Sequence, residues 1–324
     1  MASDIQTWVR VAAFVGGGIA MGVGAIGAAV GEGYSAACAN SAISRNPKSA
    51  GEIFKAMLVG QAIAESAAIF ALVIAMLLLF SKFPTDSYVM VAVLLSAGIC
   101  MGLGAIGSGI GSGFPTGAAC IGISRQPGIG KRLTTNMLIG SAVCQTPSIF
   151  SMVVSFILLF TDFSHQPLLP TFAALVGAGL SAGLGSIGPS LGGGLVAQAG
   201  CEGIARQPTR STALTNIMLL GQAVSQTTAV YGLLISFILL FKGVPDSTAL
   251  APAAALLAAG ICMGFAAIGP GIGEGYVGQK AVDAMARNED VTAVITRTML
   301  VGQAVTESTG IYGMVIALVL IFVV

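Results

Sequence analysis

The chain of 324 residues is 55% hydrophobic and only 8% charged. Because soluble proteins carry about 25% charged residues, this composition excludes an ordinary water-soluble domain and predicts an integral membrane protein. The formal net charge is +1, so the chain lacks the basic surface that binds nucleic acid. The expected surroundings are a lipid bilayer, and no nucleic-acid partner is expected.

The first apolar segment, residues 16–33, reads GGGIAMGVGAIGAAVGEG. In water so many glycines would argue against a helix. In lipid a helix keeps every backbone amide paired, and small residues allow neighbouring helices to approach closely. The glycines therefore predict an inner layer of tightly packed helices rather than a nucleotide-binding loop. The start of the chain has no basic stretch leading directly into an apolar run, so no cleaved signal peptide is expected.

The second apolar segment covers residues 57–80, and its 24 residues are long enough to span a bilayer with some tilt. It carries Glu65 in its middle. The polar loop RNPKSAG, residues 45–51, separates the two segments. This order predicts a transmembrane helical hairpin over residues 1–82.

The same pair of segments recurs three more times. The position of Glu65 is taken by Gln145, Gln226 and Glu307, at spacings of 80, 81 and 81 residues. Such internal periodicity indicates tandem repeats. We therefore predict an all-α membrane protein with eight transmembrane helices, arranged as four hairpins over residues 1–82, 83–163, 164–244 and 245–324. The second helices of the other three hairpins are predicted over residues 137–160, 218–241 and 299–322. These bulkier helices are expected to cover the glycine helices.

The first helices carry a second series of positions with the same spacings, namely Glu32, Ser112, Gly193 and Glu274. The midpoint of Glu32 and Glu65 falls in the loop of the first hairpin. Two antiparallel helices thus bring both carboxylates to one depth, roughly 20 Å into the membrane at about 1.5 Å per residue. The same geometry pairs Glu274 with Glu307 in the fourth hairpin. Ionisable residues at such a depth indicate a functional site.

Two carboxylates at this depth cannot both stay ionised without compensation. One shared proton and one bound cation would leave each pair neutral, and nearby hydroxyls suit a hard, oxygen-ligated cation. These hydroxyls belong to Ser66, Ser308, Thr309 and Tyr312. Alternatively, the glutamates are protonated and only bond helix to helix. Gln145 and Gln226 offer an amide oxygen but no neutralising charge, so their hairpins are expected to be spacers without an ion.

The distribution of Lys and Arg predicts the orientation. Eleven basic residues lie in the hairpin loops and their flanks, against three on the other side. By the positive-inside rule the loops face the cytoplasm and both termini face out. The six cysteines lie in apolar stretches without metal-binding spacing and are expected to pack, and His165 has no partner for a metal site.

Several motifs closely resemble the c subunit, or proteolipid, of rotary F-/V-type ATP synthases. They are a glycine-rich helix ending GEGY…ARN (273–288), the loops RNP (45–47) and RQP (125–127 and 206–208), and GQAVTESTGIYG (302–313). The resemblance covers nearly the whole chain, four times over, and fused hairpins resemble V-type and some sodium-type rings. It implies a non-catalytic, ion-translocating rotor whose hairpins stand side by side in a closed c-ring. The implied partners are copies of the chain, a stator a subunit with its arginine, and central-stalk subunits; no organic cofactor is implied.

The resemblance also implies site residues. Sodium-binding members use a first-helix Gln or Glu, a second-helix Glu followed by Ser and Thr, the carbonyl two residues before that Glu, and a Tyr five residues after it. The matching residues in the fourth hairpin are Glu274, Val305, Glu307, Ser308, Thr309 and Tyr312. Those in the first are Glu32, Ile63, Glu65 and Ser66, but Ala67 and Phe70 replace the Thr and Tyr. Because this family builds each site across two hairpins, further candidate donors are Thr146 with Val143, Thr227 with Val224, and Tyr231.

The polar loops are implied to contact the central stalk. Their residues are Arg45, Asn46, Pro47, Arg125, Gln126, Pro127, Arg206, Gln207, Pro208, Arg287 and Asn288. The last loop reads RNE and lacks the proline.

The leading hypothesis is a Na⁺-carrying rotor in a prokaryotic cell membrane, with the metal ligands Glu32, Glu65, Glu274 and Glu307. With two ions per chain in place of four, fewer ions would cross the membrane per ATP. Each ATP could then drive an ion against a steeper gradient. The same carboxylates could instead carry H⁺. Alternatives of another class are a self-contained secondary transporter or channel, which the parallel repeats disfavour, and a purely structural proteolipid.

Overall fold

The structure is a computed structural model that describes residues 2–244 and 249–322, and all regular secondary structure of these residues is helical. Eight stretches among them are long and apolar enough to cross a membrane. The helices are α1 (Ala2–Arg45), α2 (Ala50–Phe80), α3 (Val89–Arg125), α4 (Gly130–Cys144), α5 (Thr146–Phe160), α6 (Leu168–Gly185), α7 (Ile187–Arg206), α8 (Ser211–Ser225), α9 (Thr227–Phe241), α10 (Leu250–Arg287) and α11 (Thr292–Phe322). The predicted hairpin limits 1, 245 and 324 lie outside the described residues.

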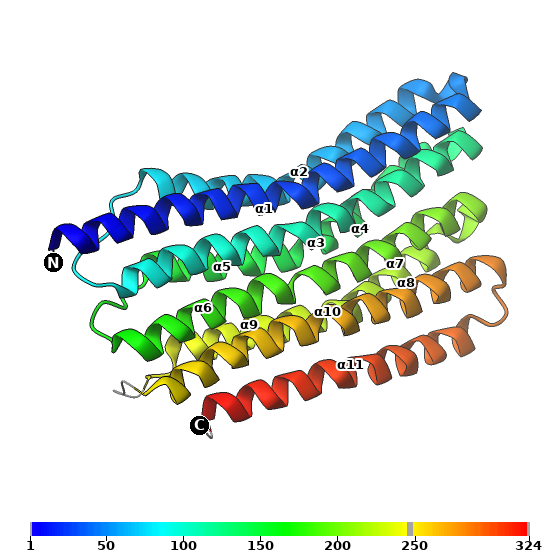
Figure 1. The fold of residues 1–324 in the computed structure, drawn as a ribbon. Helices are drawn as coiled ribbons and strands as arrows, with labels where there is room; N and C mark the ends of the chain where they lie inside the picture. The colour runs from blue at the N-terminus through cyan, green and yellow to red at the C-terminus, as the bar shows by residue number, and fades with distance from the viewer. Residues whose placement is uncertain (1, 245–248, 323–324) are drawn as a thin grey trace.

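Four helical hairpins lie side by side in chain order, from α1–α2 at one edge to α10–α11 at the other (Figure 1). The hairpin loops gather at one end of the bundle, and both termini lie at the opposite end (Figure 1). The first three loops each contain a short 3₁₀ turn, which starts at Pro47, Pro127 or Pro208. Proline suits this position because its fixed φ is helical and its missing N–H would be unpaired there anyway. Asn46, Gln126, Gln207 and Asn288 each follow the last residue of a first helix.

The helices form two layers. The first helices, α1, α3, α6–α7 and α10, contact one another in succession, and we call them the glycine layer. The second helices, α2, α4–α5, α8–α9 and α11, pack against it as the covering layer. A Cβ added at Gly31 would overlap the backbone of Gly109, and one at Gly192 would overlap Gly271. Glycine is therefore required at these crossings, because the helix backbones themselves are in contact.

Three of the eight spans are interrupted, at Gln145, Ser186 and Gln226. The backbone stays right-handed at each, with φ −81° and ψ −16° at Gln145, so the span continues in one direction. Pro147 and Pro189 follow the first two interruptions and remove an N–H from the helix ladder. No proline accounts for the third. The unbroken α2 begins at Ala50, earlier than the predicted residue 57, because the polar residues after the loop are helical too.

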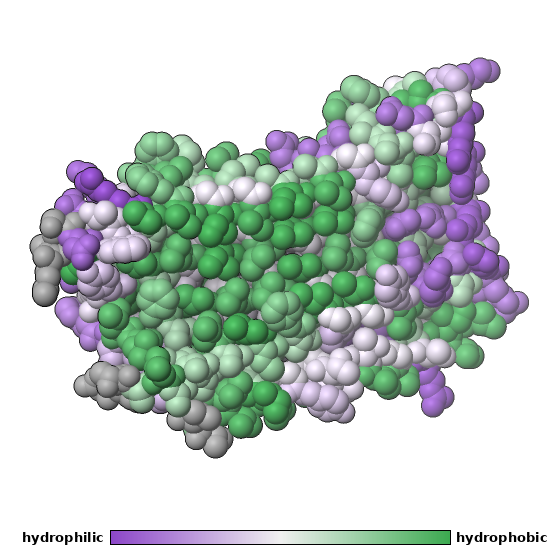
Figure 2. Space-filling model, viewed as in Figure 1, coloured by the Kyte–Doolittle hydropathy of each residue, from purple (hydrophilic) through white to green (hydrophobic). Residues whose placement is uncertain are grey.

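An apolar belt crosses the middle of the molecule, and polar residues gather at its two ends (Figure 2). This surface is the one expected of a protein whose waist is surrounded by hydrocarbon and whose ends meet water.

Candidate ion-binding site

The contact between the third and fourth hairpins holds a pair of carboxylates. Glu274 on α10 is 0% exposed, and neither of its carboxylate oxygens has a hydrogen-bond donor. Glu307 on α11 is near enough to interact with it electrostatically. The hydroxyl of Tyr231 on α9 donates a hydrogen bond of 2.5 Å to Oε1 of Glu307. Because a buried carboxylate without a donor is strongly unfavourable, this arrangement requires a proton or a cation.

The third hairpin contributes further oxygens to the same place. Thr227 lies one turn before Tyr231, so both side chains occupy the face of α9 that meets the fourth hairpin. The Thr227 hydroxyl donates to the carbonyl of Val224 at 2.9 Å. The third hairpin thus carries a carbonyl, a hydroxyl and a phenol near this face, and the phenol contacts Glu307. A set made only of oxygen atoms suits a hard cation.

Gln303 fixes the two helices that carry the carboxylates. Its amide nitrogen donates to the carbonyl of Glu274 on α10 and to the carbonyl of Gly221 in the third hairpin, each at 3.1 Å. Gln222 makes the equivalent two bonds one hairpin earlier, each at 3.0 Å. Sequence reasoning missed this glutamine. Its signal was the motif GQA, which recurs at residues 60–62, 221–223 and 302–304.

The carboxylate pair of the first hairpin lies at an open edge of the described chain. Glu32 is half-buried and Glu65 is exposed, and the two interact electrostatically. Ser66 donates to the carbonyl of Ile63 at 2.6 Å, as Thr227 does to its own carbonyl partner. Among the described residues, no hydrogen bond reaches the side chain of Glu65.

The second hairpin replaces the carboxylate pair by a closed set of hydrogen bonds. The amide nitrogen of Gln145 donates to the Ser112 hydroxyl at 2.7 Å, to the carbonyl of Ile63 at 3.1 Å and to the carbonyl of Ser108 at 3.3 Å. An N–H donor therefore bonds the Ile63 carbonyl, one of the predicted ion ligands. This contact needs no ion to satisfy it.

The third hairpin places its glutamine differently, and the side-chain oxygen of Gln226 is buried without a hydrogen-bond partner. The amide nitrogen of Gln226 donates to the carbonyl of Pro189 at 3.0 Å and lies where a side chain at Gly193 would be. The loss of the first-helix side chain makes room for the second-helix amide. Thr146 and Val143, the candidate donors of the second hairpin, thus face a hairpin that has no carboxylate.

At the open edge of the fourth hairpin, Ser308 donates to the carbonyl of Val305 at 2.7 Å and Thr309 donates to the carbonyl of Thr306 at 3.0 Å. Tyr312 is 65% exposed. These groups repeat the oxygen-bearing face of the third hairpin, with no further hairpin of this chain against them.

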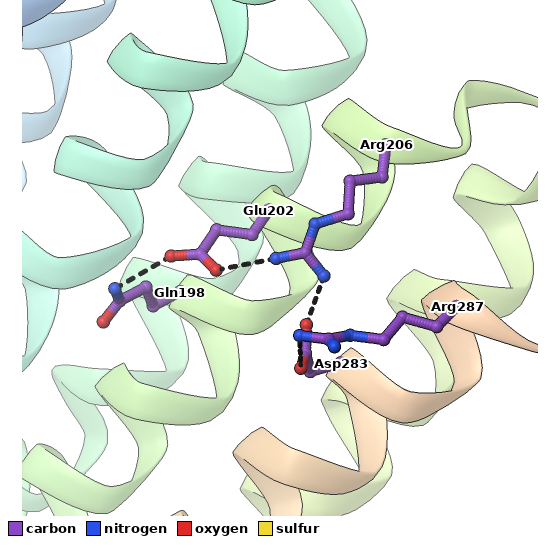
Figure 3. Close-up of polar contacts among 5 residues, drawn as sticks. All are labelled: Gln198, Glu202, Arg206, Asp283 and Arg287. Carbon is purple, nitrogen blue, oxygen red and sulfur yellow. Dashed lines mark hydrogen bonds and ion pairs between the residues drawn. The ribbon is translucent and has the colours of Figure 1, made fainter.

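At the loop end, two of the four predicted stalk-contact arginines belong to a chain of ion pairs between the third and fourth hairpins (Figure 3). Arg206 contacts Glu202 of its own helix and Asp283 of α10, and Arg287 contacts Asp283 at 2.9 Å. Gln198 donates to Glu202 at 3.0 Å. These arginines are neutralised within the chain.

The first two loops differ. Arg45 and Arg125 are exposed and form no ion pair among the described residues. Ser41 and Ile121 stand one turn before them, where the later hairpins have an acid. Asn46 donates to the carbonyl of Ser124 at 3.0 Å and joins the two loops.

Comparison with known proteins identifies the family. A family model that describes the C subunit of ATP synthase matches the chain four times, at residues 15–78, 95–158, 176–239 and 257–320. The chain belongs to this ATP synthase proteolipid family. The A-type ATP synthase subunit K of Methanocaldococcus jannaschii is 30% identical over 230 residues, which are 71% of this chain and 96% of that protein.

Single-hairpin proteolipids are similar to shorter parts of the chain. The ATP synthase c subunit of Petrotoga mobilis is 56% identical over 68 residues, covering 21% of this chain and 71% of its own length. That of Thermotoga petrophila is 54% identical over 68 residues, covering 21% of this chain and 80% of its own. This proteolipid, with one family match in each hairpin, is therefore a multi-pass, ion-translocating and non-catalytic subunit of a rotary ATP synthase, and the expectation of a c-type fold is confirmed.

Proposed function

We propose that this proteolipid carries Na⁺ on two sites per chain as the rotor ring of a rotary ATPase. The observation behind the proposal is the fully buried Glu274, whose carboxylate has no donor of its own and lies beside Glu307. One cation and one shared proton leave this pair neutral. The proposed ligands are the two carboxylates, the Thr227 hydroxyl and the Val224 carbonyl, while Tyr231 orients Glu307.

Each site is proposed to take its hydroxyls from the preceding hairpin, as Tyr231 bonds the glutamate of the next one. The residues at this position in the four hairpins are Phe70, Phe150, Tyr231 and Tyr312. The phenylalanines precede the two hairpins that have glutamine, and Tyr231 precedes one that has glutamate. The missing Thr and Tyr after Glu65 therefore do not weaken the first-hairpin site, since those positions face the second hairpin.

Tyr312 then requires a following hairpin with a carboxylate, and the first hairpin of a second copy has one. We assign Val305, Ser308 and Tyr312 of one copy, together with Glu32 and Glu65 of the next, to the second site. This site is incomplete in a single chain.

The edges of the glycine layer support the same head-to-tail contact. Gly188 packs against the backbone of Ile268 in the following hairpin. A Cβ added at Gly269, the equivalent position of the fourth hairpin, would meet no neighbouring helix within 4 Å. Ile26, which is equivalent to Ile268, is 53% exposed. Ile26 of one copy on Gly269 of another would continue the repeat. Head-to-tail contacts of this kind close into rings when the rotation between copies divides a full circle.

Sodium is proposed rather than a proton because a bound proton needs one acceptor, whereas the face of the third hairpin that bonds Glu307 also carries the Thr227 hydroxyl and the Val224 carbonyl. The proposal places the loops on the cytoplasmic side of a prokaryotic cell membrane, by the positive-inside rule. The proposed partners are the stator a subunit with its arginine and, at the polar loops, the central stalk. The sequence-derived hairpin limits are proposed as the functional units.

Labelling with a carboxyl-reactive carbodiimide tests the proposal. The purified protein is labelled across a pH series with and without sodium, and modified residues are mapped by mass spectrometry. Sodium is expected to protect Glu65 and Glu307 from labelling, with choline chloride at equal ionic strength as the control. Labelling that follows pH alone would make the protein a proton rotor. Migration as a monomer in mild detergent would favour a self-contained transporter and contradict the ring.

A further inference from the structure

A groove of about 330 Å³ lies on the covering layer at the loop end, between α4 of the second hairpin and α8 of the third. Its polar lining comprises Lys131, Arg132, Thr135, Asn136, Ser211, Thr212, Thr215 and Asn216, and its apolar wall is Ile139 and Ile204. None of these residues is acidic, so the groove presents mainly cations and hydrogen-bond donors.

Two adjacent cations dominate the groove. Lys131 and Arg132 are both exposed and occupy the first turn of α4, where the helix dipole adds positive potential instead of offsetting their charge. A guanidinium nitrogen of Arg132 donates to the carbonyl of Pro208 at 3.0 Å, which holds the side chain across the groove. Among the described residues, neither cation forms an ion pair, but the Glu52 carboxylate of the first hairpin lies beside Gly130 and lines a neighbouring pocket with Lys131.

This pair of charges is specific to the second hairpin. The equivalent positions are Gly51 and Glu52 in the first hairpin and Thr212 and Ala213 in the third. A general need for charge at the membrane edge would not require two adjacent cations, which no other hairpin has at this position. In the third and fourth hairpins, by contrast, Arg206, Arg210 and Arg287 each contact an acid.

The floor of the groove is organised around a buried amide. Asn136 is 2% exposed, and its oxygen accepts a hydrogen bond of 2.7 Å from Thr215 across the two hairpins. Further into the membrane-spanning part, Leu138 and Leu220 are 37% and 38% exposed. Leu138 follows Lys131 by two helical turns and therefore lies on the same side of α4. The cationic rim thus continues into an apolar strip that faces lipid.

We propose that this groove binds an anionic phospholipid. The phosphate lies against Lys131 and Arg132, with hydroxyl and amide donors of the third hairpin beside it, and the acyl chains follow Leu138 and Leu220. Basic pockets between membrane helices bind anionic headgroups. A free anion would use the cations but would leave the apolar strip without a role, so a lipid fits the whole groove.

Native mass spectrometry of the detergent-solubilised protein tests this site, with dioleoyl phosphatidylglycerol and dioleoyl phosphatidylcholine as probes. The variant K131Q/R132Q is compared with K280Q/R297Q, which removes two cations elsewhere on the fourth hairpin. Since each basic residue near an anionic lipid surface contributes about fivefold in affinity, we expect about 30-fold weaker phosphatidylglycerol binding for K131Q/R132Q and wild-type binding for the control.

Lys131→Gln alone leaves the bond from Arg132 to Pro208 intact and is expected to weaken binding about fivefold, which keeps the test available if the double variant assembles poorly. Equal binding of phosphatidylcholine and phosphatidylglycerol would overturn the proposal. So would equal losses in the two double variants. Displacement of the lipid by excess inorganic phosphate would overturn the lipid assignment and leave a site for free anions.

Discussion

Replacing Tyr231 with phenylalanine removes one hydrogen bond from one of the two proposed ion sites. The phenol bonds Glu307 at 2.5 Å, and this carboxylate is charged when it holds a cation and neutral when it is protonated. A hydrogen bond to a charged group contributes about 1.5–3 kcal/mol and one between neutral groups about 0.5–1.5 kcal/mol. The difference, about 1–1.5 kcal/mol, predicts a five- to tenfold loss of cation affinity at Glu307.

The assay is protection of Glu307 from carbodiimide across a sodium titration, with Glu65 in the same sample as the internal reference. Tyr231→Phe is expected to shift the midpoint at Glu307 upwards and leave Glu65 unchanged. Tyr312→Phe is the matched variant and is expected to do the reverse, because Tyr312 is proposed to bond Glu65 of the next copy. Equal shifts at both glutamates, or a shift at Glu65 caused by Tyr231→Phe, would refute the assignment of hydroxyls to the preceding hairpin.

Three further outcomes follow from the packing. Gln145→Glu is expected to lower the thermal stability of the assembled protein in detergent, since it removes the N–H donor to Ile63 and buries a charge, and sodium should not protect position 145 from labelling. Gly192→Ala is expected to lower the unfolding temperature, because its Cβ would overlap the backbone of Gly271. In the control Gly51→Ala the added Cβ meets nothing within 4 Å, so this variant should raise stability by up to about 1 kcal/mol. Equal effects of the two variants would contradict the backbone contact at Gly192. Gly269→Leu is expected to leave helix content by circular dichroism unchanged but to reduce the large oligomer on size exclusion, and an intact oligomer would rule out this edge as the contact between copies.

Most of the fold was accessible from the sequence because the signal was repeated. Apolar segments of 24 residues at a period of about 81 residues predict spans and hairpins directly, since the length of a membrane helix is set by the bilayer. None of the three interruptions was predicted from the sequence, and the one at Gln226 has no proline after it that could have indicated it. The early start of α2 at Ala50 was not predicted either. Its first residues are polar, and hydropathy detects only the part of a helix that lies in the hydrocarbon.

The site was predictable only in part. Glu274 and Glu307 followed from their depth, because an ionisable side chain within a membrane span is costly and marks a functional position. Which hairpin would supply the hydroxyls did not follow from the sequence, since Thr227 and Ser66 look alike there. The bond from Tyr231 to Glu307 supports the preceding hairpin. The glutamine contacts of the second and third hairpins depend on side-chain direction, which spacing alone does not give.

The neutral side chains of Gln145 and Gln226 have a consequence for movement. In a ring of copies, the carboxylates of the fourth hairpin and of the first hairpin of the next copy are neighbours, and two uncharged hairpins separate them from the following pair. A rotor built in this way would not advance in equal steps. We expect each chain to contribute one short and one long advance past the stator, the long one a diffusive passage over two hairpins that neither take up nor release an ion. Single-molecule rotation at low driving force would then record paired dwells, and uniform dwells would show that Gln145 and Gln226 take part in the cycle after all.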